Sequence, residues 1–266
     1  MAVVLVTGGT GHLGRELVAL LKPAHQVRVL ARSPQTDPEV QWVQGDLATG
    51  EGIAEAMAGV RVVLHAATLS PAASRGYFVP ADLWRSPPEV DVDATRELLR
   101  EAERVGVDHF LYVSIVGVDH PRGPYLRLKH VAEGLVRTGG VPWSIVRATQ
   151  FYWLLDRMLG KAAWLPALAL PAELSTQPGD AADFAAYLLE CVAAGPGGQC
   201  EDFGGPEVMT LGDLVHQWQQ ARDRPRPILK FPVPSRVAQT VAEMTCPDGH
   251  RGTTTWSQWL NTHPAE

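Results

Sequence analysis

Short apolar runs alternate with helical patterns along the first 150 residues of the chain. Most of these runs are rich in valine, isoleucine or leucine, as expected for buried strands. The expected strands lie at residues 2–6, 26–31, 41–43, 61–66, 109–113 and 143–146. Between them, apolar residues recur at helical spacing over residues 13–21, 51–57, 92–105 and 124–137. Strands that alternate with helices predict an α/β fold, a doubly wound parallel sheet of the Rossmann type.

The pattern changes beyond Gln150, where aromatic residues and prolines become frequent. This part predicts helices at residues 180–193 and 211–222, strands at 199–203 and 228–233, and two short helical segments, the last containing Trp256 and Trp259. It has no glycine-rich turn of its own. We therefore expect a dinucleotide-binding domain at residues 1–150 and a smaller C-terminal lobe at residues 151–266 on the substrate side of the sheet.

The sequence TGGTGHLG at residues 7–14 joins the first expected strand to the first helix. Gly8 permits a tight turn, Gly11 lets the backbone approach a pyrophosphate, and Gly14 lets the helix pack close to the strand. The pyrophosphate would lie at the start of the helix, where unpaired N–H groups and the dipole favour an anion. The strand before the turn and the helix after it favour dinucleotide binding over a plain tight turn.

The end of the second strand indicates which cofactor the turn holds. Arg32 lies eighteen residues after Gly14, with no acid beside it. An acid here binds the 2′-hydroxyl of NAD, whereas an arginine suits the 2′-phosphate of NADP. We therefore expect NADP(H) to be preferred over NAD(H); the alternative is a solvated charge at a strand end. Asp46, after the third strand, either accepts from the adenine amino group or caps the following helix.

The fourth strand leads into small residues and then into a long loop. Ala66 and Ala67 leave room for a cofactor across the strand ends, and His65 is expected to be a buried structural histidine. Loops as long as residues 68–89 are usually functional or mobile, so we interpret this one as a flap over the substrate. It contains the aromatic residues Tyr77, Phe78 and Trp84.

Ser114, Tyr125 and Lys129 are the candidate catalytic residues. Tyr125 and Lys129 are four residues apart on an expected helix, so both project from one face, and Ser114 follows a strand. Open α/β sheets bind their ligands at such strand ends. The Lys129 ammonium would lower the phenol pKa, Tyr125 would donate a proton to a developing alkoxide, and Ser114 would position the same oxygen. The alternative is an amphipathic helix with a partly exposed tyrosine and a solvated lysine.

Composition narrows the function further. The 266 residues carry a net charge of −6 with no block of like charge, which argues against nucleic-acid binding. Three cysteines without a CxxC pair indicate neither a disulfide framework nor a metal site. The longest apolar stretch, residues 162–172, is interrupted by prolines and is too short to span a membrane. Because a strand begins at residue 2, we expect no signal peptide and a cytoplasmic location.

The chain resembles the atypical short-chain dehydrogenase/reductases, and most of all their NmrA-like NAD(P)H-binding branch. The resemblance rests on motifs spread over nearly the whole chain: TGGTGHLG at 7–14, Arg32, GDL at 45–47, HAAT at 65–68, VSIVGVD at 113–119, YLRLK at 125–129, WSIVRATQF at 143–151 and GGPEVMTLGDL at 204–214. The first motif is specific for the superfamily. The others are specific for the branch and not for a substrate.

The resemblance implies roles for individual residues. Those that embrace the pyrophosphate would be Gly8, Thr10, Gly11, His12, Leu13 and Gly14. Arg32 would select NADPH, Asp46 and Leu47 would face the adenine, and Ser114, Tyr125 and Lys129 match the reductase proton-donor set. The chain departs from the pattern in that only ten residues separate Ser114 from Tyr125. Many NmrA-like proteins also lack the tyrosine and bind the cofactor without clear turnover.

These expectations combine into one principal function. It is an NADPH-dependent oxidoreductase that transfers hydride to a small carbonyl or quinone substrate, held by Phe151, Trp153 and the loop at 68–89. One alternative is a non-catalytic NADP(H) sensor that reports the redox state of the cofactor to a partner. A weaker alternative is an assembly factor like the reductase-derived accessory subunit of respiratory complex I. We expect a monomer or a homodimer, with no nucleic-acid or membrane partner.

Overall fold

A parallel sheet forms the centre of the computed structural model, which describes residues 2–33, 35–70, 74–77, 79–83, 85–121, 123–162 and 164–264. Nine strands of this described part make up the sheet, in the order β13-β10-β6-β5-β4-β1-β2-β3 with β9 also paired to β6. Their bounds are β1 Val3–Thr7, β2 Gln26–Ala31, β3 Val40–Gln44, β4 Val62–His65, β5 His109–Ile115, β6 Trp143–Ala148, β9 Gly198–Gln199, β10 Phe203–Gly204 and β13 His250–Arg251. Every paired register among them is parallel. The predicted α/β doubly wound sheet is confirmed.

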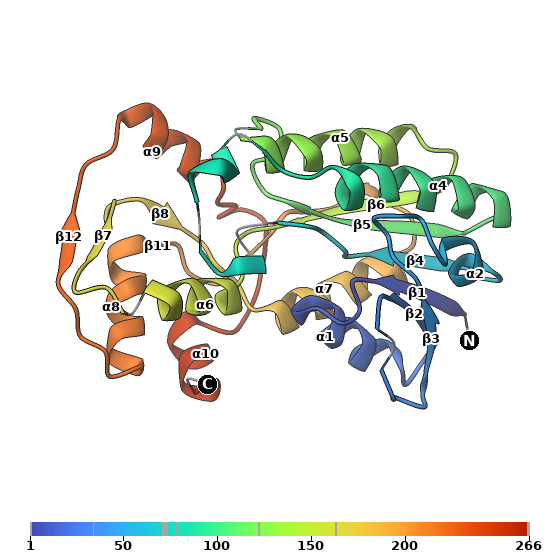
Figure 1. Ribbon diagram of the computed structural model, residues 1–266, viewed down its shortest axis with the longest axis horizontal. Helices are drawn as coiled ribbons and strands as arrows, with labels where there is room; N and C mark the ends of the chain where they lie inside the picture. Colours follow the sequence, from blue (N-terminus) through green and yellow to red (C-terminus); the bar gives the residue numbers. More distant parts are fainter. Residues whose placement is uncertain are drawn as a thin grey trace.

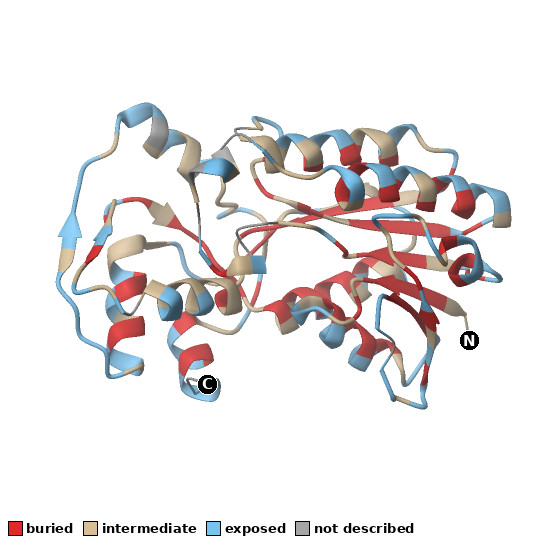
Figure 2. Cartoon of the chain, viewed as in Figure 1, coloured by how far each residue is buried: buried red, intermediate tan, exposed pale blue. Residues whose placement is uncertain are grey.

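Helices cover both faces of the sheet (Figure 1). One face carries α2 (Ile53–Met57), α4 (Ala94–Val105) and α5 (Pro124–Thr138); the other carries α1 (His12–Leu21) and α7 (Ala181–Ala194). The strands are apolar on both sides for this reason: Val4 and Val6 pack with α1, whereas Leu5 packs with α2 and α4. Figure 2 shows the central strands buried almost throughout. Strand order reverses between β1 and β4, which places a crevice at their carboxyl ends.

The C-terminal lobe lies beside the carboxyl ends of the strands, at the left of Figure 1. It comprises α6 (Tyr152–Ala162), β7 (Leu168–Leu170), β8 (Ser175–Thr176), β11 (Met209–Thr210), α8 (Leu211–Ala221), β12 (Ile228–Lys230), α9 (Ser235–Ala242) and α10 (Trp256–Thr262). Its core is aromatic. The rings of Trp256 and Trp259 stack at 5.5 Å, and Tyr152 packs against both.

Parts of the C-terminal half return to the sheet. β10 and β13 extend it beyond β6, and α7 packs against α1. The single strand expected at residues 199–203 is instead two short strands, β9 and β10, that meet different stretches of β6. The division near residue 150 stays a prediction, and the sheet itself takes strands from both sides of it.

The segment between β4 and α4 is partly helical. A 3₁₀ turn spans Pro80–Leu83, and a π-helical turn, η2, spans Glu89–Asp93 directly before α4. The helix expected to begin at residue 92 therefore has a wider first turn. Tyr77 is exposed, and the predicted flap residues Phe78 and Trp84 lie outside the described residues. Whether this segment acts as a flap stays a prediction.

Candidate cofactor site and active site

A cleft of about 710 Å³ lies where the carboxyl ends of the strands meet the C-terminal lobe. Its wall includes every residue that the sequence predicts for the site. These are Gly8, Thr10, Gly11, His12, Leu13, Gly14, Arg32, Asp46, Leu47, Ala66, Ala67, Ser114, Tyr125, Lys129, Phe151 and Trp153. Seven segments distant in sequence thus contribute to one cavity, and the individual roles of these residues stay predictions.

The glycine-rich turn has the geometry of an anion cradle. Gly8 has a φ of +74°, and a Cβ at Gly14 would lie 2.0 Å from the Gly8 carbonyl oxygen. Gly11 is the N-cap of α1, and no side chain caps the helix there. The N-cap residue therefore supplies no side chain to the first turn of α1, which lines the cleft, and the binding of a dinucleotide pyrophosphate at this turn stays a prediction.

Trp153 covers the turn from the other side of the cleft. Its ring stacks on that of His12 with centroids 4.1 Å apart and planes within 10°. This contact joins α6 to the start of α1. Trp153 is therefore placed at the turn, whereas the sequence suggests only a substrate wall. Phe151 lines the cleft and packs against Phe184 of α7 at 5.6 Å.

Arg32 and Asp46 line the cleft where β2 and β3 end. Arg32 is exposed and makes no ion pair with any residue in the described ranges. Asp46 Oδ1 accepts a hydrogen bond from the Ala48 N–H at 2.9 Å, so it stabilises a turn. The N-cap of α2 is Gly52, and the interpretation of Asp46 as its cap is wrong. Asp46 also lines the cleft, and its contact with an adenine ring stays a prediction.

Lys129 is buried on the first half of α5. Its Nζ donates to the Val113 carbonyl at 2.8 Å and lies 4.2 Å from the centre of the Tyr112 ring. It also lies 3.7 Å from Asp91 Oδ1, with the two side chains 3% and 0% exposed. Burial lowers the pKa of Lys129, and the Asp91 carboxylate opposes that shift.

A chain of hydroxyl groups connects Tyr125 to the same carboxylate. Thr68 Oγ1 donates to Asp91 Oδ1 at 2.6 Å, so its remaining contact, with Tyr125 Oη at 2.8 Å, is one in which Tyr125 donates. Burial and the Asp91 charge raise the pKa of Tyr125 above its usual range. The expectation that Lys129 lowers this pKa is wrong for this structure, because Asp91 lies beside both groups and favours the neutral phenol.

Ser114 lies at the floor of the cleft. Alternation along β5 places it on the same face as Tyr112, which packs under α4 and α5. The residue lines the cleft and is only 2% exposed. Its Oγ is buried, and its contact with the Glu133 carboxylate helps to lower the Glu133 pKa. Ser114 therefore belongs to the site by position, and its contact with a substrate oxygen stays a prediction.

Asp91 and Thr68 are the site residues that sequence reasoning missed. Asp91 is fully buried in η2, and its Oδ2 accepts from the Leu69 N–H at 2.9 Å. Asp91 therefore holds both Lys129 and the chain after β4 in place. No local signal separates Asp91 from the exposed Asp93, because both acids alternate with valines in the same way.

His65 is buried beneath the cleft, as expected for a structural histidine. Thr95 Oγ1 donates to the Asp91 carbonyl, so it accepts from His65 Nε2 at 2.9 Å, and His65 Nδ1 accepts from Thr7 Oγ1 at 2.7 Å. Both ring nitrogens of the neutral imidazole thus have a hydrogen-bond partner. Burial and the nearby Lys129 charge lower the pKa of His65 to about 3.

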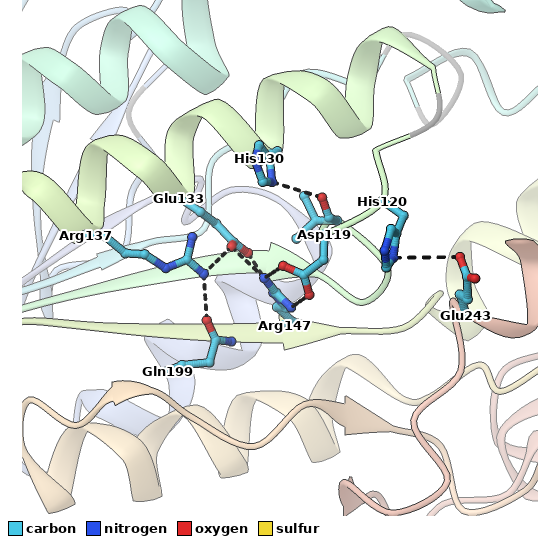
Figure 3. Close-up of polar contacts among 9 residues, drawn as sticks. Asp119, His120, His130, Glu133, Arg137, Arg147, Gln199 and Glu243 are labelled. Atoms are coloured by element: carbon cyan, nitrogen blue, oxygen red, sulfur yellow. Dashed lines mark hydrogen bonds and ion pairs between the residues drawn. The ribbon is translucent and has the colours of Figure 1, made fainter.

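An ion-pair network holds α5 on the sheet (Figure 3). Arg147 of β6 donates to both Glu133, at 2.8 Å, and Asp119, at 2.7 Å. Glu133 is fully buried one turn beyond Lys129, and it also pairs with Arg137. Burial opposes ionisation of Glu133, but the Arg147 guanidinium overcomes it and lowers the Glu133 pKa. The network anchors the short loop between Ser114 and Tyr125 through Asp119, and Tyr125 reaches the cleft.

A sequence model described as NAD(P)H-binding matches residues 8–193. The chain belongs to this NAD(P)H-binding family. The match begins at the glycine turn and ends in α7, so it covers the cleft wall formed by the sheet. The expected NAD(P)H-binding fold and family are confirmed, whereas the NmrA-like branch stays a prediction.

Two curated relatives show how this NAD(P)H-binding chain compares with characterised proteins. It is 29% identical over 233 residues to the (4-alkanoyl-5-oxo-2,5-dihydrofuran-3-yl)methyl phosphate reductase of Streptomyces griseus, covering 84% of this chain and 75% of that protein. It is 28% identical over 156 residues to the photosystem II assembly factor Ycf39 of Cyanophora paradoxa, covering 56% of this chain. That match spans only 46% of the Ycf39 length.

The fold of this NAD(P)H-binding protein recurs in solved structures. A short-chain dehydrogenase/reductase superfamily protein from Agrobacterium tumefaciens, solved with bound NAD, superposes with a TM-score of 0.71 at 23% identity. The comparison covers 98% of this chain and 95% of the other. Among the described residues, no helix has the length and apolar character needed to cross a membrane. No cluster of three or more histidine, cysteine or acidic side chains in that part is arranged to hold a metal ion.

Proposed function

We propose that the chain is an NADPH-dependent reductase that transfers hydride to a small carbonyl or quinone substrate. The observation that carries the proposal is the placement of Tyr125, Lys129 and Ser114 in the same cleft as the glycine-rich turn. The Streptomyces griseus relative, named as a reductase, supports this class of reaction. When bound, NADPH would supply the hydride.

The residues of the chain have separable tasks in this reaction. The N-terminus of α1 would hold the pyrophosphate, and Arg32 would bind the 2′-phosphate. Tyr125 would donate its proton to the oxygen that becomes an alkoxide, since its raised pKa keeps it protonated at neutral pH. For this step the phenol O–H must turn from Thr68 to the substrate. Lys129 would lie beneath the nicotinamide ribose, held in place by Asp91.

The test is the loss of NADPH absorbance with a panel of quinones and aldehydes, after fluorescence has established NADPH binding. We expect Tyr125→Phe to reduce kcat about 100-fold or more, as for removal of a general acid, with little change in the NADPH Kd. Tyr77→Phe is the matched control, because Tyr77 is exposed and its hydroxyl is not in the cleft wall. Undiminished turnover in Tyr125→Phe would rule out this mechanism.

A non-catalytic NADP(H) sensor is the second candidate, and the hydrogen bond from Tyr125 to Thr68 favours it. With its proton engaged and the Lys129 charge balanced by Asp91, the site is stable without a substrate. A sensor must bind NADPH and NADP⁺ with different affinities or in different conformations. Equal affinities, together with equal protection of residues 68–89 from protease, would contradict sensing.

A further inference from the structure

The substrate end of the cleft is neutral except for one charge. Beyond Trp153 the wall is formed by neutral residues of the segment after β4, of α6 and of the chain near Met244. Arg157 of α6 is the only charged residue that the described structure places in this part of the wall. Lys129 lies at the floor and is already paired with Asp91. An exposed arginine without a carboxylate partner among the described residues therefore sets the charge of this end.

Arg157 uses little of its hydrogen-bonding capacity on the described residues. Its Nη2 donates to the Ser74 carbonyl at 2.7 Å, and within the described ranges it has no ion pair. A guanidinium has five N–H donors, arranged to match a carboxylate or a phosphate. Trp153, one turn earlier on the same face of α6, has a buried indole Nε1 that finds no acceptor among the described residues. Both side chains offer donors at one end of the cleft.

We propose that the substrate carries an anionic group, a carboxylate or a phosphate monoester, that Arg157 binds while the carbonyl lies at Tyr125. This inference rests on the proposed reductase function. The apolar part of the substrate would lie against Leu154 and Leu69, which line the space between the two polar ends. Arg157 is then a specificity residue: it selects among carbonyl compounds and takes no part in hydride or proton transfer.

The geometry favours this role over two others. A purely structural arginine would be expected to pair with an acid or to use several carbonyls, whereas Arg157 has one such acceptor, the Ser74 carbonyl, in the part of the chain that the structure describes. A contact with the cofactor pyrophosphate is less favoured, because the glycine-rich turn and the N-terminus of α1 already supply donors there. Trp153 also lies between His12 at that turn and Arg157 along α6.

The experiment uses pairs of aryl ketones that differ only in charge. One pair is para-acetylbenzoate and its methyl ester; the other is para-acetylbenzyl phosphate and para-acetylbenzyl alcohol. The two pairs distinguish a carboxylate from a phosphate preference. We expect the full-length protein to reduce the preferred anion with a kcat/KM about 10- to 100-fold above that of its neutral partner, the ratio expected for a charge-assisted hydrogen bond. Added salt should reduce this advantage.

Three variants test the assignment to Arg157. Arg157→Gln should abolish the preference for the anion through an increase in KM, and leave the neutral substrate and the NADPH Kd unchanged. Arg157→Lys should retain part of the preference. Arg127→Gln, which removes an exposed arginine outside the cleft wall, should retain all of it. An equal loss for the charged and neutral substrates, or a weaker NADPH Kd in Arg157→Gln, would overturn the proposal.

Failure of the reductase function gives a different result. If the NADPH-loaded protein reduces no member of either pair, binding of the same four compounds is measured by calorimetry. Binding of an anion but not of its neutral partner, lost in Arg157→Gln, would support the anion site without catalysis. Equal binding of charged and neutral compounds, or no binding of any of them, would overturn it.

Discussion

Lys129 Nζ lies 3.7 Å from Asp91 Oδ1, and both side chains are almost completely buried. Asp91 also accepts hydrogen bonds from Thr68 and from the Leu69 N–H, so one carboxylate joins η2, α5 and the segment after β4. A buried carboxylate at this position raises the pKa of both Tyr125 and Lys129 relative to a neutral residue. Asp91 is therefore a positioning residue that also sets the charge of the site.

The first prediction concerns the pH profile of Asp91→Asn. Removal of the carboxylate should lower the pKa of Tyr125, because the nearby negative charge that disfavours the phenolate is gone. The reduction needs the protonated phenol, so the alkaline limb of the kcat/KM profile should move to lower pH. Asp93→Asn is the control on the same turn, since Asp93 is exposed and pairs with Arg96. An unchanged alkaline limb in Asp91→Asn would contradict this role.

The second prediction concerns the glycine-rich turn. Gly14→Ala would place a Cβ 2.0 Å from the Gly8 carbonyl, so α1 must move away from β1. We expect the NADPH Kd to increase at least 10-fold and the protein to lose about 1–3 kcal/mol of stability through overpacking. Gly134→Ala in α5 has no atom within 4 Å of the new Cβ and should be neutral or stabilising. Fluorescence titration and urea unfolding of both variants measure the difference.

The third prediction concerns cofactor choice. If Arg32 binds the 2′-phosphate, Arg32→Ala should weaken NADPH binding about 10- to 100-fold, since a hydrogen bond to a charged group contributes about 1.5–3 kcal/mol. NADH lacks the phosphate and provides the control in the same variant, with an unchanged Kd. Equal weakening of NADPH and NADH binding would show a general electrostatic effect. No weakening of either would mean that Arg32 is a solvated charge at a strand end.

The fold was predictable from sequence where the signal is local. Residues 26–31 read as a strand because apolar residues alternate along it, and β2 has those bounds. The roles of Gly8, Gly11 and Gly14 were predictable too, because a tight turn before a helix requires glycine at those positions. The hydrogen bond between Tyr125 and Thr68 has no local sequence signal. The two residues are 57 positions apart in the sequence, and the packing of η2 against α5 helps to bring them together. The raised pKa of Tyr125 was not predictable for the same reason, since the burial of its side chain and its charged neighbour Asp91 both depend on segments distant in sequence.

The last prediction follows from the neutral, doubly hydrogen-bonded His65. Its pKa is about 3 in the folded protein against 6.5 for an unperturbed histidine, so only the unfolded state takes up the proton between these values. The resulting loss of stability begins as the pH falls below 6.5 and continues until about pH 3. At about pH 5 the loss should be roughly 2 kcal/mol relative to neutral pH, from 1.36 kcal/mol per unit over about 1.5 units.

Urea unfolding of His65→Gln at the two pH values isolates this effect. The variant should be less stable at both, because Thr7 and Thr95 lose a well-placed partner, but its difference between neutral pH and about pH 5 should shrink by roughly 2 kcal/mol. His216→Gln, at an exposed histidine of α8, should keep the full difference. If the stability difference between the two pH values persists in His65→Gln, other buried groups cause the acid sensitivity. Protonation of His65 in the unfolded state would then not explain it.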